Sequence, residues 1–196
     1  MPPDRLQEQI TFIVEVDRLK QVLRQSMLIG DGRRENDAEH SWHICLMAVL
    51  LREYAAEEVD LLRAVEMLLV HDIVEIDAGD TFAYDEAGHA DKEAREKKAA
   101  ERLFGMLPQD QERRLRALWD EFEARQTPEA RYAAAMDRLQ PMLLNLATEG
   151  GGWKVHGITK GQVVAYNRHM DEGAPDLWAY ARQQVEEAVG KGYLAE

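Results

Sequence analysis

The chain has 196 residues, of which 45% are hydrophobic and 31% are charged, and its formal net charge is -13. These values are typical of a folded domain with a sizeable core and exclude a disordered chain. The acidic excess opposes binding to a nucleic acid polymer, whereas a small phosphate ester needs only a local cluster of cations.

The first helix is predicted from apolar residues that recur at steps of three and four. They are Leu6, Ile10, Ile13, Val16, Leu19 and Leu23. This helix should end near a turn at residues 29–32. The amino-terminal segment is acidic where a secretion signal is basic, and no apolar run reaches the roughly 20 residues of a membrane span. Cys45 is the single cysteine, so no internal disulfide is possible. We therefore expect a cytoplasmic protein that does not enter a membrane.

The second and third helices carry the most informative polar residues. Asn36 or Asp37 is expected to cap a helix whose inward face begins at His40 and continues through apolar positions. The third helix is predicted from about Asp60 to Ile76 and contains most of the run MLLVHDIVEIDAGDT. Within about three helical turns, and without any Lys or Arg, this run carries His71, Asp72, Glu75, Asp77 and Asp80.

The rest of the chain also predicts helices. After a loop at TFAYDEAGH, a charged helix precedes another that begins at Pro108. Thr127 and Pro128 are typical of a helix start, and Pro141 should kink that helix before GGGW ends it. Two more helices are expected at about 159–170 and 175–189. No alternating β-type segment is evident, so we predict an all-α bundle of about eight helices in a single domain, residues 1–196.

Three histidine and aspartate residues are predicted to lie on apolar helix faces, where an unpaired polar group is costly. They are His40, His71 and Asp137. Taken singly, each has an ordinary explanation, such as a hydrogen-bonded core histidine or an aspartate paired with Arg131 or Arg138. Together with Asp72, however, they supply two imidazoles and two carboxylates from three helices. That set of nitrogen and oxygen ligands suits a first-row divalent metal ion.

The same residues carry a resemblance to a known family. His40, the adjacent pair His71 and Asp72, and then Asp137 resemble the H...HD...D signature of the HD-domain metal-dependent phosphohydrolases. The segments RRENDAEHSW and LLVHDIVEIDAGDT are similar to those of the branch that contains the bacterial 5'-deoxynucleotidases. The likeness runs from about residue 19 to about residue 146. It implies an HD-domain helical bundle, a homodimer, and one cobalt, manganese, zinc or copper ion bound by these four residues, with Asp72 also serving catalysis.

The resemblance also implies roles around the metal. Glu75 would orient or deprotonate the attacking water, and Asp80 would contact the sugar 3'-hydroxyl. Arg24 would bind the substrate phosphate, with Arg33 or Arg34 as alternatives. The implied reaction releases phosphate from a nucleoside 5'-monophosphate, with a 2'-deoxy sugar as the first expectation.

A departure from that branch keeps alternatives open. Gln25 stands where those enzymes have a tryptophan, and Trp42 is expected on another helix face. The substrate could therefore be another small phosphate ester, and a nucleotide-sensing module without turnover is the rival class. Only His89 lies between the His-Asp pair and Asp137, which favours a mononuclear hydrolytic site over a diiron oxygenase. His43, three residues after His40, could support the site, but a helix-surface position is preferred, and no role follows for His156 or His169.

Overall fold

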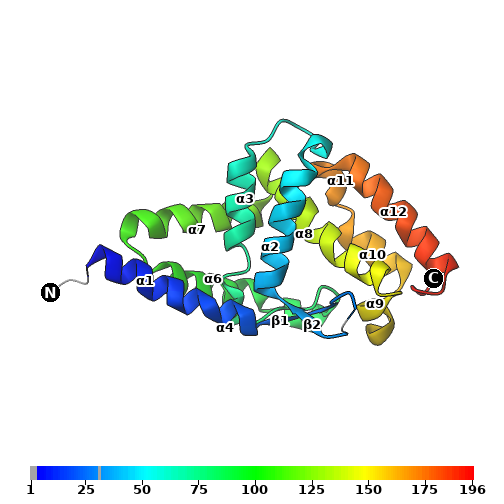
Figure 1. Ribbon diagram of the computed structural model, residues 1–196, viewed down its shortest axis with the longest axis horizontal. Coiled ribbons are helices and arrows are strands. Elements are labelled where there is room, and N and C mark those ends of the chain that lie inside the picture. Colours follow the sequence, from blue (N-terminus) through cyan, green and yellow to red (C-terminus); the bar gives the residue numbers. More distant parts are fainter. Residues whose placement is uncertain (1–3, 31) are drawn as a thin grey trace.

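The computed structural model describes residues 4–30 and 32–196 (Figure 1). Its helices and strands are, in chain order, α1 (Arg5–Val16), the 3-10 helix η1 (Asp17–Gln21), β1 (Leu23–Met27), β2 (Arg34–Asn36), α2 (Asp37–Leu50), the 3-10 helix η2 (Arg52–Tyr54), α3 (Leu61–Val70), α4 (Glu75–Ala78), α5 (Glu86–His89), α6 (Lys92–Phe104), α7 (Gln109–Ala124), α8 (Pro128–Ala147), α9 (Gly151–His156), α10 (Lys160–Asn167), α11 (Met170–Gly173) and α12 (Pro175–Gly190).

The predicted all-α fold is confirmed, with a small addition. Among the described residues, eight helices have eight or more residues: α1, α2, α3, α6, α7, α8, α10 and α12. The prediction of one long first helix was wrong, because α1 ends at Val16 and β1 pairs with β2 in an antiparallel hairpin. Leu23 is 46% exposed, so its helical spacing was not a sign of burial. The predicted turn at residues 29–32 lies between the two strands, and its Asp31 is outside the described residues.

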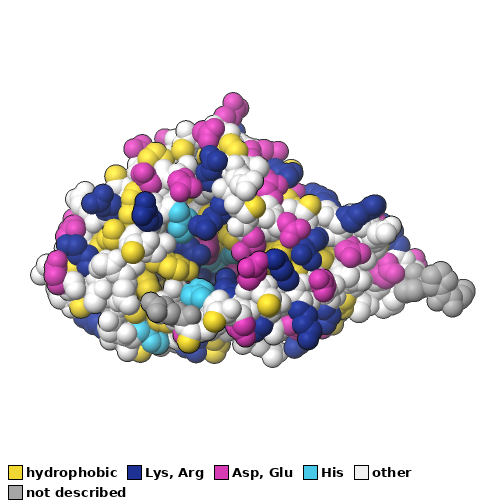
Figure 2. All heavy atoms as spheres, turned by 180° about the vertical axis from the view of Figure 1, so that it is seen from behind, with side chains coloured by type: hydrophobic (Ala, Val, Ile, Leu, Met, Phe, Trp, Pro, Cys, Tyr) yellow, Lys and Arg dark blue, Asp and Glu magenta, His cyan; other side chains and the backbone are white. Residues whose placement is uncertain are grey.

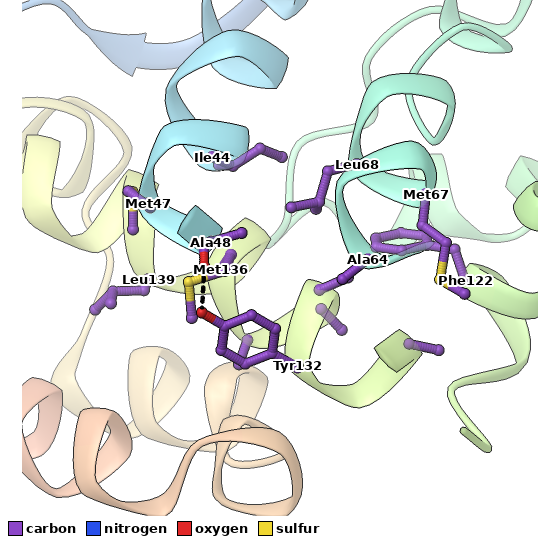
Figure 3. Packing of buried hydrophobic residues seen from close by; sticks show 14 of the residues in the cluster. Ile44, Met47, Ala48, Ala64, Met67, Leu68, Phe122, Tyr132, Met136 and Leu139 are labelled. Carbon is purple, nitrogen blue, oxygen red and sulfur yellow. Dashed lines mark hydrogen bonds between the residues drawn. The ribbon is translucent and has the colours of Figure 1, made fainter. Parts of the chain in front are cut away.

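Helix α8 forms the centre of the bundle. It packs against α2, α3, α7, α11 and α12 (Figure 1). Thr127 caps it by accepting a hydrogen bond from the amide of Ala130 at 3.2 Å, and Pro128 occupies the first turn, as predicted. Figure 3 shows Tyr132 of α8 reaching α2, where its hydroxyl donates to the carbonyl oxygen of Ala48 at 2.8 Å. The helix continues through Pro141 to Ala147.

Helix α2 begins with a reciprocal capping box. The Asn36 side chain accepts from the amide of Glu39 at 3.0 Å, and the Glu39 carboxylate accepts from the amide of Asn36 at 3.1 Å. This cap fixes the start of α2, and His40 follows on its first inward-facing turn, fully buried. The hairpin and α2 contact each other, and both contact α8.

The predicted third helix is divided in two by a tight turn. Helix α3 ends at Val70, and α4 starts at Glu75. Between them, the amide of Ile73 donates to the carbonyl of Val70, and that of Glu75 to the carbonyl of Asp72, in the three-residue spacing of a 3-10 turn. Side chains three residues apart eclipse in such a turn, whereas in an α-helix they are offset by about 60° around the axis. Asp72 and Glu75 therefore point the same way.

The carboxy-terminal helices belong to the same core. Leu177, Trp178 and Val185 of α12 are buried in one hydrophobic cluster with residues of α2, α3 and α8. In the part of the chain that the structure describes, we find no helix with the length and apolarity needed to cross a bilayer.

Candidate metal centre and substrate cavity

Four side chains converge where α2, the end of α3 and α8 meet. The Nε2 atom of His40 lies 3.0 Å from Asp137 Oδ1, and the Nε2 atom of His71 lies 3.7 Å from the same oxygen. His71 Nε2 also lies 3.0 Å from Asp72 Oδ1. All four side chains are buried. We call His40, His71, Asp72 and Asp137 the ligand cluster, and the sequence predicted each of its members.

Hydrogen bonds orient both imidazoles toward the centre of the cluster. The Nδ1 atom of His71 donates to the carbonyl oxygen of Leu68 at 2.8 Å, which leaves Nε2 with a free lone pair. The Nδ1 atom of His40 donates to Gln140 Oε1 at 3.0 Å. Gln140 is fixed in turn, because its Nε2 atom donates to Glu35 at 2.6 Å. Partners of this kind hold metal-binding histidines in one tautomer and one orientation.

The spacing of the donor atoms fits one divalent cation. Two ligands at about 2.1 Å from a cation lie roughly 3.0 Å apart at a right angle and roughly 3.4 Å apart at a tetrahedral angle. The three separations in the cluster are between 3.0 and 3.7 Å. His71 Nε2 is buried without a well-formed hydrogen bond to any described residue, which is costly unless a ligand satisfies it. The residues therefore fit a metal ion.

The charges of the cluster also fit a cation. Burial lowers the pKa of His40, which keeps the imidazole in the neutral form that binds metal. Burial opposes protonation of His71 too, but Asp72 and Asp137 outweigh it and raise its pKa to about 10. A proton on His71 thus supplies positive charge that a bound cation would supply instead.

A second group of carboxylates adjoins the cluster. Ligand atoms of Asp37, Asp72 and Glu75 lie within 4.8 Å of one another, and all three residues are buried. Burial and the neighbouring Asp72 charge raise the pKa of Asp37 to about 8 and that of Glu75 well above its ordinary value. Sequence analysis missed Asp37, because its place at the start of α2 suggested only a capping role. The sequence did contain a signal for Asp37, because two acidic residues, Glu35 and Asp37, stand only a few positions before His40.

Arg24 is the cation nearest to these carboxylates. It comes from β1, the strand that the sequence did not predict. Its guanidinium lies 3.0 Å from Asp72, 3.5 Å from Asp37 and 3.8 Å from Glu35, and only 13% of its side chain is exposed. Arg24 therefore borders the ligand cluster and neutralises part of its charge.

Asp80 reaches the site through a turn after α4. Gly79 adopts a positive φ of 76°, a conformation that glycine accepts without strain, and the chain then turns back. Arg95 of α6 holds the loop by donating to the carbonyl oxygens of Ala78 and Gly88 and to the Thr81 hydroxyl. Burial raises the pKa of Asp80, although Arg24 opposes the shift. Asp80 thus lines the same cavity as Glu75.

The cavity has a volume of about 290 Å³. It opens on the face shown in Figure 2, where basic, acidic and histidine side chains gather around a hollow. Asp72, Glu75, Asp80 and Asp137 line one part of it. Phe82, Tyr84, Trp153 and Tyr166 form an aromatic wall, within which the rings of Tyr84 and Tyr166 are 5.4 Å apart.

Several predicted residues lie away from the cavity. Arg33 forms an exposed bidentate ion pair with Glu39. The Arg34 guanidinium donates to backbone carbonyl oxygens of β1, so it stabilises the hairpin. Asp77 pairs with a surface arginine, and Trp42 is 66% exposed, as its helical position predicted.

The histidines without predicted roles have different environments. His43 is half-buried, and its Nδ1 atom accepts from Gln140 at 3.2 Å, so it fits the alternative of a residue that supports the site better than a plain surface position. His89 and His169 line the cavity, whereas the ring of His156 packs on Phe82 outside it. Sequence analysis also missed three cations of the cavity wall, Lys92, Arg125 and Arg138.

Comparison with known proteins independently tests the family resemblance that the sequence motifs indicated. A profile described as HD domain matches residues 16–178. The 5'-deoxynucleotidase HDDC2 of Bos taurus is 28% identical over 135 residues, which are 68% of this chain and 64% of that protein. Its Homo sapiens counterpart is 27% identical over 68% of this chain and 65% of that protein. The match thus spans less than two thirds of the length of these curated relatives.

Solved structures show the same fold. A crystal structure described as a predicted metal-dependent phosphohydrolase from Magnetospirillum magnetotacticum MS-1 is 57% identical, covers 100% of both chains and has a TM-score of 0.95. An HD-domain phosphohydrolase from Listeria innocua is 17% identical, covers 93% of this chain and 86% of its own, and has a TM-score of 0.58. The likeness to the Listeria innocua structure supports the fold alone.

Proposed function

The chain belongs to the HD-domain family, and from this premise we propose that it is a metal-dependent phosphomonoester hydrolase acting on 2'-deoxynucleoside 5'-monophosphates. The observation that carries the proposal is that His71, Asp72, Asp137 and Glu75 line one cavity, with His40 buried against Asp137. The names of the bovine and human relatives, and the description of the Magnetospirillum structure, support the same reaction class.

The ligand cluster is proposed to hold one divalent cation, whether cobalt, manganese, zinc or copper. Such a cation would lower the pKa of a bound water and offset negative charge on the phosphoryl oxygens. Glu75 is proposed to take the proton of the attacking water. Its buried Oε2 atom has no hydrogen-bond partner among the described residues, and its raised pKa gives the carboxylate the basicity that this task needs.

The hydrolysis balances with water as the only co-reactant. The water oxygen bonds to phosphorus, the bond between phosphorus and the ester oxygen breaks, and the leaving oxygen gains a proton. The products are the nucleoside and inorganic phosphate. Arg24 is proposed to contact a phosphoryl oxygen, and Asp80 to accept a hydrogen bond from the sugar 3'-hydroxyl.

The shape of the cavity supports a nucleotide-sized substrate. Its volume of about 290 Å³ is near the lower end of the range for small-molecule sites. Gln25 lines the cavity, but the aromatic wall offers rings on which a base can stack. If the substrate is another small phosphate ester, this wall would discriminate among the leaving groups.

A phosphate-release screen tests the proposal. Purified protein is stripped of metal, resupplied with single cations, and assayed with deoxy- and ribonucleoside 5'-monophosphates and simple phosphate esters. We expect metal-dependent release that is fastest with a deoxynucleotide. If phosphate is released only from other esters, the substrate is one of those esters and not a deoxynucleotide. If the protein binds nucleotides tightly but releases no phosphate with any cation, a sensing module is favoured.

We also propose that the protein is a homodimer. The outer face of α2 carries Trp42, Leu46, Val49 and Leu50, which are between 42% and 66% exposed. Contiguous apolar surface of this kind marks contact with another chain. Light scattering should return twice the 22.4 kDa mass of one chain, and a single-chain mass would contradict the dimer.

A further inference from the structure

Arg138 borders the ligand cluster at Asp137, as Arg24 borders it at Asp72. Its Nε atom lies 3.7 Å from Asp137 Oδ2, which is too long for a hydrogen bond. Among the described residues, the guanidinium makes one hydrogen bond, from Nη1 to the Tyr166 hydroxyl at 2.7 Å. Because an arginine has five N–H donors, most of those of Arg138 remain available to a ligand in the cavity that it lines.

The Arg138 guanidinium is held in place by aromatic rings. Its Cζ atom lies 4.5 Å from the centroid of the Tyr166 ring, and Tyr84 packs on that ring from the aromatic wall. A planar cation stacked on a tyrosine keeps its edge free for two parallel hydrogen bonds to an oxyanion. The side chain is therefore ordered before any ligand arrives, which reduces the entropy cost of binding.

His169 and Arg125 line the same cavity as Arg138, and both arginines act electrostatically on His169. The Nε2 atom of His169 is buried and has no partner among the described residues. Burial, Arg138 and Arg125 together lower the pKa of His169 to about 4, so its ring is neutral and has one N–H, for which the Tyr166 backbone carbonyl competes with a ligand. Arg125 ends α7 in a left-handed conformation with φ of 50°, and its side chain makes no ion pair in the described structure.

Three carboxylates face this group, and the nearest, Asp137, lies 3.7 Å from Arg138 Nε and offsets part of its charge. Glu96 is paired with Lys92 at 3.1 Å. Glu123 also lines the cavity, and burial raises its pKa, although Lys92 opposes that shift. Arg24, by contrast, shares its guanidinium among three carboxylates. The N–H donors that remain available to bind a dianion are therefore those of Arg138, next to Asp137, rather than those of Arg24.

We propose that Arg138, His169 and Arg125 form an anion-binding site that holds the phosphoryl oxygens of a dianionic phosphate monoester. The assignment to a substrate phosphate depends on the proposed function, but the binding of phosphate itself does not depend on turnover. Arg138 supplies the principal contact, Tyr166 positions it, and Arg125 closes the mouth of the site. The phosphate thus meets the ligand cluster from the side of Asp137.

Inorganic phosphate is the probe that separates this proposal from catalysis. Isothermal titration of phosphate into manganese-loaded protein is compared for the wild type, Arg138→Gln, Arg138→Lys and His169→Gln. Arg5→Gln is the matched control, because Arg5 pairs with Asp110 on the surface. We expect Arg138→Gln to weaken phosphate binding at least about tenfold, the lysine variant to recover part of the loss, and His169→Gln to lose less. The control should be unchanged.

Manganese content and thermal melting are measured for each variant, so that loss of metal or fold is not mistaken for loss of phosphate contact. If Arg138→Gln keeps its metal and binds phosphate as tightly as the wild type, the anion site is wrong. It is equally wrong if the wild type binds no phosphate. If phosphate binding depends on Arg138 while no phosphate ester is hydrolysed, the anion site stands and the proposed hydrolase function fails.

Discussion

Two arginines border the ligand cluster, and their surroundings differ sharply. Arg24 lies within 4 Å of carboxylates from Glu35, Asp37 and Asp72 and is 13% exposed. Arg138 has one hydrogen bond, to a tyrosine hydroxyl, and one neighbouring carboxylate, that of Asp137 at 3.7 Å. The comparison teaches that equal charges near a site are shared differently: Arg24 mainly balances three buried acids and has little left for the single phosphoryl contact proposed for it, whereas Arg138 faces one acid and has more donors left for a ligand.

The largest expected effect comes from removing the carboxylate of Asp137. Asp137 contacts His40 and His71 through one oxygen and lies beside Arg138. In Asp137→Asn we expect loss of bound metal and a fall in kcat/KM of at least about 10³-fold. Metal analysis and phosphate release check this, with the surface variant Asp77→Asn as control. Full metal occupancy in Asp137→Asn would show that the cluster is wrongly assigned.

A variant of Glu75 should separate the effect on the chemical step from any effect on metal binding. Glu75→Gln keeps the size of the side chain but removes its ability to accept a proton. We expect kcat to fall by roughly 10²- to 10⁴-fold, with metal content and phosphate affinity retained. Single-turnover kinetics alongside metal analysis measure both. A loss of metal equal to that of Asp137→Asn would make Glu75 a ligand and leave the proton acceptor unidentified.

Arg24→Gln sharpens the contrast between the arginines most directly. Removing this guanidinium leaves three buried carboxylates without their nearest cation, and breaking such a buried pair costs about 3–5 kcal/mol of unfolding free energy. Arg138→Gln should cost less, because it gives up one hydrogen bond to a neutral hydroxyl and one carboxylate contact at 3.7 Å, whereas Arg24 has three carboxylates within 4 Å. Urea unfolding of metal-free protein compares them. Equal destabilisation by the two variants would remove the distinction.

The smallest expected effect concerns the sugar. Asp80→Ala deletes the proposed acceptor for the 3'-hydroxyl, so we expect about tenfold weaker discrimination between deoxyribose and ribose substrates. Asp80→Asn keeps an acceptor oxygen and should retain most of the discrimination. The ratio of kcat/KM values for paired nucleotides measures this. An unchanged ratio in Asp80→Ala would assign the sugar contact elsewhere.

The sequence predicted the parts of the site that local rules govern. Helical periodicity placed His40, His71 and Asp137 on inward faces, and the Thr127 and Pro128 signal predicted the start of α8. It did not predict the 3-10 turn between α3 and α4, because the apolar periodicity continues across it and only tertiary packing tightens the hydrogen bonds.

The contacts that were missed join distant elements. Arg24 was predicted as a phosphate contact, but its three carboxylate neighbours were not, because it approaches them through a short hairpin whose strands have weak alternation in sequence. Arg138 was weighed only as a partner for Asp137, and its stacking on Tyr166 joins α8 to α10, 28 residues away. Helical spacing identifies which face of a helix is buried, but it does not identify the neighbour that the face meets.

The central claim is that one divalent cation binds among His40, His71, Asp72 and Asp137. A crystal soaked in manganese and measured near the manganese absorption edge tests it directly. We predict a single strong anomalous peak at about 2.0–2.3 Å from His40 Nε2, His71 Nε2 and one oxygen of each aspartate. A peak elsewhere with this cluster empty, or no peak at saturating manganese, would contradict the account.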